Sequence, residues 1–156
     1  MAYNRFDVSP ASTVACVAST KKTVLGVLAA SNVVLKLLEM SESFDGSTSS
    51  NAPAITEMDQ ITFATNGPGT NNTSATPAKQ DNGRGETIQA TAGYNWTTQP
   101  TVITQQYPID LGQYNGLYHY IFPQTAPQLC IGGKGAGISI TSPNNVNFNG
   151  KLSCEE

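Results

Sequence analysis

Charged residues are scarce in this chain of 156 residues. Asp, Glu, Lys and Arg make up 12% of it, about half of their usual share, whereas Ser, Thr, Asn and Gln supply about a third. The net charge is −3, and the eight basic residues are scattered, apart from the adjacent Lys21 and Lys22. Surfaces that bind nucleic acid or anionic membranes need clustered basic residues, so we expect neither partner.

Long hydrophobic runs are also missing. The longest apolar stretch, VLGVLAASNVVL, is short and is interrupted by Gly26, Ser31 and Asn32. The first ten residues, MAYNRFDVSP, lack the basic start and apolar run of a secretion signal. We therefore expect no signal peptide and no membrane span.

Residues for catalysis and metal binding are few. The single histidine, His119, lies in GLYHYIF, where it shares a strand face with Leu117 and Ile121. This pattern favours a core or interface histidine over a general base, and one histidine excludes a histidine-pair metal site. The segment GGKGAG lacks the spacing of a phosphate-binding loop. We expect no enzyme activity, no metal and no cofactor, and an esterase or lyase is a remote alternative.

The three cysteines, Cys16, Cys130 and Cys154, cannot all pair within one chain. None lies in a C-x-x-C motif or beside a histidine. Reduced, buried thiols in a protein made in a cytoplasm are the favoured interpretation, and a bridge between Cys130 and Cys154 is the alternative.

Short runs rich in Thr, Val, Ile and aromatic residues alternate with Gly, Pro, Asn and Ser. This pattern predicts an all-β chain, an antiparallel β-sandwich of the jelly-roll kind with about eight or nine strands. The expected strands lie at 13–17, 23–29, 33–44, 54–63, 87–94, 101–107, 116–122, 137–141 and 145–154. In the last of them, Val146, Phe148, Leu152 and Cys154 should point inward, and Asn147, Asn149 and Lys151 outward.

The sequence divides into an N-terminal arm, 1–12, and a single sandwich domain, 13–156, with a long polar loop at 64–85. Tyr3 and Phe6 are apolar residues in the arm, which includes Arg5; they either pack on their own sandwich or dock on another subunit. The loop, ATNGPGTNNTSATPAKQDNGRG, is expected to make contacts through polar residues such as Asn71 and Asn72.

Four blocks of the sequence resemble, in order, those of a family of small virion proteins from tailed bacteriophages and prophages. The blocks are KKTVLGVLAASNVVLKLLEMSESFDGSTSSNAPAITEM, ETIQATAGYNWTTQPTVI, GLYHYIFPQ and LCIGGKGAGISITSPNNVNFNGKLSCEE. They share a K-T-V-L strand, a strand ending in S-F-D-G, a Q-A-T block, a strand ending in Phe-Pro and a final T-S-P-x-x-V-N segment. The similarity covers roughly residues 21–156 and is lost in the polar loop.

This resemblance implies a capsid decoration, or cement, protein: a β-sandwich that sits as a homotrimer on the outer surface of the virion. Made in the host bacterial cytoplasm, it would stabilise the capsid by bridging subunits of the major capsid protein. Residues expected at capsid or subunit contacts are Tyr3, Arg5, Phe6, Asn71, Asn72 and Trp96.

A carbohydrate-binding module of a phage head or tail is the alternative function. Tyr94, Trp96 and Tyr114 are aromatic residues of the kind that stack on sugars in β-sandwich proteins. An exposed cluster of these side chains would favour this function, and burial of Trp96 at a trimer contact would disfavour it.

Overall fold

The computed structural model describes residues 3–45, 52–62, 67–81, 83 and 85–156, which form thirteen strands and no helix. The strands are β1 (Arg5–Val8), β2 (Val14–Cys16), β3 (Lys22–Leu28), β4 (Leu35–Asp45), β5 (Ala54–Thr62), β6 (Thr73–Ala75), β7 (Ala78–Lys79), β8 (Thr91–Tyr94), β9 (Thr101–Leu111), β10 (Tyr114–Ile121), β11 (Gln128–Cys130), β12 (Lys134–Thr141) and β13 (Val146–Glu155).

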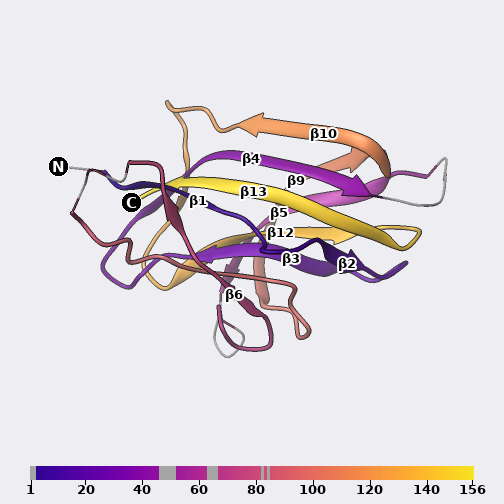
Figure 1. Ribbon diagram of the computed structural model, residues 1–156, viewed down its shortest axis with the longest axis horizontal. Helices are drawn as coiled ribbons and strands as arrows, with labels where there is room; N and C mark the ends of the chain where they lie inside the picture. The colour runs from indigo at the N-terminus through magenta and orange to yellow at the C-terminus, as the bar shows by residue number, and fades with distance from the viewer. Residues whose placement is uncertain (1–2, 46–51, 63–66, 82, 84) are drawn as a thin grey trace.

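Two antiparallel sheets form a sandwich, seen from the side in Figure 1. Sheet A has the order β10-β4-β13-β1-β7, with β11 beside β4 and β2 beside β13. Sheet B has the order β6-β8-β3-β12-β5-β9. The expectation of an antiparallel all-β sandwich is confirmed, whereas jelly-roll connectivity stays a prediction.

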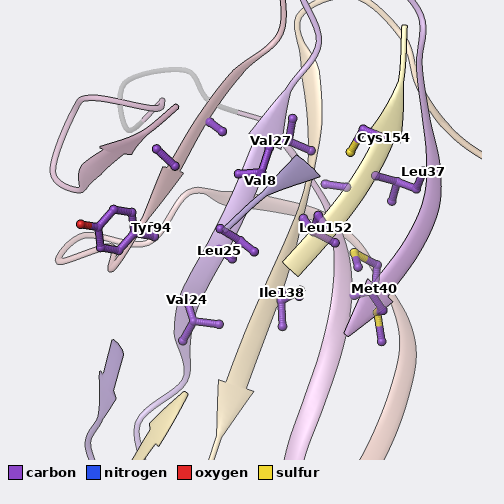
Figure 2. Packing of buried hydrophobic residues seen from close by; sticks show 14 of the residues in the cluster. Val8, Val24, Leu25, Val27, Leu37, Met40, Tyr94, Ile138, Leu152 and Cys154 are labelled. Atoms are coloured by element: carbon purple, nitrogen blue, oxygen red, sulfur yellow. The ribbon is translucent and has the colours of Figure 1, made fainter. Parts of the chain in front are cut away.

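The core fills the space between the sheets. Val24, Leu25 and Val27 of β3 face Met40 of β4 and Leu152 of β13 across the interior (Figure 2). The alternation in the last strand is confirmed. Its inward residues Val146, Phe148, Leu152 and Cys154 are buried, and its outward residues Asn147, Asn149 and Lys151 are partly or fully exposed.

One side of the sandwich is closed by aromatic rings. Tyr107 of β9 lies at the edge of sheet B, and Tyr120 of β10 at the edge of sheet A. Their ring centroids are 5.7 Å apart, and Phe122 packs edge-on against both rings. These contacts tie the two sheets together where no strand joins them in the part of the chain described.

Residues 5–8 of the predicted N-terminal arm belong to the sandwich. They form β1, which pairs with β13 on one side and β7 on the other. Phe6 is fully buried in the core, so it packs on its own sandwich and is not a docking residue. The alternation of Phe6 and Val8 with Arg5 and Asp7 is the physical reason, since it gives this segment one apolar face.

The predicted long loop is also more ordered than its composition suggested. It contributes β6 to sheet B and β7 to sheet A, so this segment crosses from one sheet to the other. Short polar segments such as β6 and β7 can form strands because their backbone groups hydrogen-bond to neighbouring strands. Residues 64–66, 82 and 84, also part of the predicted loop, lie outside the described residues.

Candidate interaction surface

The outer face of sheet A is polar and mostly uncharged across its centre. Ser41 and Ser43 of β4 lie opposite Lys151 and Asn149 of β13 in the sheet. Because inward positions on both strands are taken by the core, these side chains point to solvent. Ser41, Ser43, Asn149 and Lys151 also line a shallow hollow on this face.

Ion pairs cluster at the β1 side of this face. Glu155 of β13 accepts a hydrogen bond from Arg5 Nε at 2.8 Å and lies 3.8 Å from Lys36 Nζ. Asp7 lies 3.6 Å from Lys151 Nζ and accepts a bond of 2.6 Å from the Ser153 hydroxyl. These contacts fix charged side chains to neighbouring strands of the same sheet.

The opposite edge of sheet A is apolar. In β10, Leu117 is 76% exposed and Ile121 is 60% exposed. The exposed Leu129 of β11 and Ile131 continue this apolar edge along β4. Sequence reasoning missed all four residues as surface residues, although the absence of Asp, Glu, Lys and Arg from 111–133 is visible in the sequence.

His119 lies between Leu117 and Ile121 on this edge and is exposed, so its expected place in the core is wrong. Its Nε2 is 3.4 Å from Glu39 Oε2 on the neighbouring β4. An edge strand can turn an apolar face to solvent, which is the physical reason that alternation was misleading here. The alternative, an interface histidine, stays a prediction.

Trp96 covers part of the outer face of sheet B. The indole lies over Gly26 and Gly93, and the residue is only 1% exposed. Trp96 is therefore buried within one copy of the chain, which corrects its expected role as a surface contact. Tyr94 is also buried, and the side chain of Tyr114 lies outside the described residues. The two described members of the expected sugar platform thus offer no open ring face.

Two acidic residues of β5 are paired with a lysine. The Lys21 ammonium group bonds to Glu57 and lies 3.2 Å from Asp59 Oδ2, and both carboxylates are buried. Burial lowers the pKa of Lys21, but hydrogen bonds to Glu57 and Asp59 outweigh it, so its pKa is raised. One ammonium group offsets one of the two carboxylate charges, and it bridges the two side chains of β5.

The remaining predicted contact residues differ in accessibility. Tyr3 is 57% exposed, and Arg5 is exposed beside Glu155. The side chain of Asn72 closes its own loop by accepting a bond from Gly69 N and donating to Gly67 O, both at 2.8 Å. The carbonyl of Asn71 accepts two bonds from Thr97. The loop asparagines thus organise their own chain, while Tyr3 and Arg5 remain accessible.

The cysteines are free thiols buried in the sandwich. Burial raises the pKa of Cys16 and of Cys130 to about 11, with Lys22 opposing the effect at Cys16. Burial also raises the pKa of Cys154 well above its ordinary value. Because the thiolate is the nucleophilic form, these groups are unreactive at neutral pH.

The described residues contain neither a metal-binding cluster nor a membrane-spanning helix. No group of three or more His, Cys, Asp or Glu side chains in that part of the chain is placed to hold a metal ion. Nor does it contain a helix of the length and apolarity needed to cross a membrane.

No family model, no curated protein and no solved structure matches this chain. A relationship to phage virion proteins therefore stays a prediction, based on the resemblance of the four sequence blocks.

Proposed function

We propose that this chain is a structural virion protein that decorates the outer surface of a tailed-phage capsid and stabilises it by bridging major capsid protein subunits. The observation that carries this proposal is the resemblance of four sequence blocks, in the same order, to phage decoration proteins. The homotrimer and the outer-surface location are part of the proposal because that resemblance implies them.

The architecture supports this proposal. An all-β sandwich is the fold that the resemblance implies, and the chain folds as two packed antiparallel sheets. The polar outer face of sheet A, on which the charged side chains are held in ion pairs, suits a protein that is crowded at high density on a shell. An oligomer repeats each weak contact between one of its subunits and the shell. Together these contacts give strong attachment to a symmetric particle.

The chemistry of the side chains supports a role without catalysis. The cysteine thiols are buried and protonated, and the carboxylates of Glu57 and Asp59 are paired with Lys21. His119 is exposed beside Glu39 on a strand edge. None of these groups has the nucleophile and base arrangement of a hydrolase.

The carbohydrate-binding alternative is weakened by burial of its residues. Trp96 packs on Gly26 and Gly93 within its own sheet, and Tyr94 is buried. Sugar stacking needs an exposed ring face, so these residues could bind a glycan only after local opening. We therefore retain capsid decoration as the single proposed function.

Reconstitution tests the proposal. Particles of the encoding phage, prepared without this chain, are mixed with the purified protein and separated by sedimentation. We expect the chain to bind in a saturable amount with a fixed ratio to the major capsid protein, and to raise the temperature at which the shells release DNA. Absence of binding at saturating protein would reject the proposed function.

Tyr3 offers a sharper test of the contact surface. The variant Tyr3→Ala removes an exposed aromatic ring ahead of β1, and Val17→Ala removes an exposed apolar side chain that follows β2. Tyr3→Ala should weaken binding to the shells, and the matched control Val17→Ala should bind as the parent does. Equal binding by both variants would exclude Tyr3 from the attachment surface.

A further inference from the structure

The outer edge of β10 from Leu117 to Ile121 is a regular strand without the protection found at the ends of the two sheets in the described part of the chain. β7 and β6, which end the two sheets, have only two and three residues. At the β9 edge, Pro108 follows Tyr107, which has a φ of 47°, and the register with β5 is irregular there. Short strands, prolines and bulges hinder edge pairing. β10 is an eight-residue strand that pairs with β4 alone, with a register shift between Tyr114 and Leu117 and a regular register from Leu117 to Ile121.

The β10 edge is also uncharged and apolar. Leu117 and Ile121 are its most exposed apolar side chains, and Tyr118 and Tyr120 are half-buried on the opposite side of the strand. No Asp, Glu, Lys or Arg occurs between residues 111 and 133, which include all of β10 and β11. An exposed edge of this composition is a template for the addition of another strand.

The charge distribution selects a second copy of the chain as the occupant. Two copies with a net charge of −3 each repel one another over most approaches. When two β10 edges meet, the uncharged segment 111–133 of one copy faces the same segment of the other copy. This approach therefore brings no like formal charges together. The His119 imidazole has a carboxylate of its own chain, Glu39, within 3.4 Å.

The sequence of β10 also fixes the register. In antiparallel pairing centred on His119, Leu117 lies opposite Ile121 of the second copy, and Tyr118 opposite Tyr120. Centring the pair on Tyr118 or Tyr120 would instead place His119 opposite Leu117 or Ile121. Apolar cross-strand pairs stabilise a sheet, so the register centred on His119 is the favoured one.

We propose that β10 of one copy pairs antiparallel with β10 of a second copy around a two-fold axis at His119, joining two A sheets into one. This contact concerns two copies of the chain alone and does not rest on the proposed function. In a decorated shell of trimers, it would link neighbouring trimers across two-fold axes.

The first test is the mass of the protein in solution. Leu117→Lys places a charge at a side chain that the fold leaves exposed, and Val17→Lys is the matched control at an exposed position after β2. In light scattering over a concentration series, the parent and Val17→Lys should reach twice the mass of Leu117→Lys. Equal masses for all three proteins, or an equal loss in both variants, would overturn the proposal.

The second test is a disulfide between copies. Opposed residues in an antiparallel pair have Cα atoms about 4.5–5.5 Å apart, within the range of a disulfide. Under mild oxidation, His119→Cys should form a covalent pair, and Val17→Cys should not. Cross-linking no greater than that of the control would contradict the register.

The contact and the proposed function can fail separately. If the parent shows no pairing in solution, and Leu117→Lys and the parent coat shells equally, the contact is rejected and capsid decoration is retained.

Discussion

The ring of Trp96 lies directly over Gly26 on the outer face of sheet B. A Cβ atom at position 26 would be 3.0 Å from Cη2 of the indole and 3.5 Å from the Ala136 carbonyl. The close approach of the ring to the sheet therefore depends on the absence of a side chain. Trp96 and Gly26 together form a second, smaller packed layer outside the main core.

Gly26→Ala should lower the free energy of unfolding by about 1–3 kcal/mol, because the added methyl group displaces the indole. Urea denaturation followed by the fluorescence of Trp96, the single tryptophan, measures the change. Gly112→Ala is the control, since a Cβ there has no neighbour within 4 Å. Equal stability of the two variants would show that the indole can shift without cost.

Phe6→Ala should lower the free energy of unfolding by about 3–5 kcal/mol, because it removes a fully buried ring that β1 contributes to the core. Thermal and urea denaturation measure this loss, with the exposed Tyr3→Ala as the neighbouring control. A loss below about 1 kcal/mol would mean that β1 is dispensable, as a loose arm would be.

Stability should fall as pH rises from 4.5 to 8 because of Glu42. Burial between the sheets raises the pKa of this carboxyl from 4.5 to about 8, and the Thr56 hydroxyl opposes the effect only in part. Between these values the folded chain holds a proton that the unfolded chain has released. The free energy of unfolding therefore decreases with increasing pH across this window and levels off above it.

Glu42→Gln should remove this contribution and stabilise the protein at pH 8, on the order of a few kcal/mol. Urea denaturation of both proteins at several pH values between 4 and 9 measures the difference. The same pH dependence in the parent and the variant would exclude Glu42 as its source.

Glu156→Ala should destabilise the protein by about 1–3 kcal/mol. The two carboxylate oxygens of Glu156 accept hydrogen bonds from Gln89 N at 2.7 Å and Ala90 N at 2.9 Å. They tie the end of β13 to the segment that leads into β8. Hydrogen exchange at Gln89 and Ala90 should accelerate in the variant, while exchange at Ile138 in the central strand β12 should change little. Unchanged protection at both amides would contradict this role.

The strands with strong alternation were predictable from the sequence. In β13, Val146, Phe148 and Leu152 form one apolar face. Packing between the two sheets removes this apolar surface from water, which stabilises the strand in that orientation. The nine predicted strands all correspond to strands of the structure. Four strands were missed. β6, β7 and β11 have two or three residues, too few for a periodic signal, and the four-residue β1 was assigned to the arm despite its alternation.

The surface residues were harder to predict, because alternation reports two faces without saying which one is covered. Leu117 and Ile121 share a face, as expected, but that face is open to solvent since β10 lies at the edge of sheet A. Trp96 was expected at a capsid or subunit contact or, in the alternative, in a sugar-binding platform. Its burial depends on Gly26 and Gly93, which lie side by side only after β3 and β8 have paired.

A three-dimensional image of the native phage particle at subnanometre resolution tests the central claim most directly. We predict a volume on the outside of the capsid that accommodates the two packed sheets and contacts at least two major capsid protein subunits. If the capsid surface carries no such volume, and the particles contain the chain at another site, the account is contradicted.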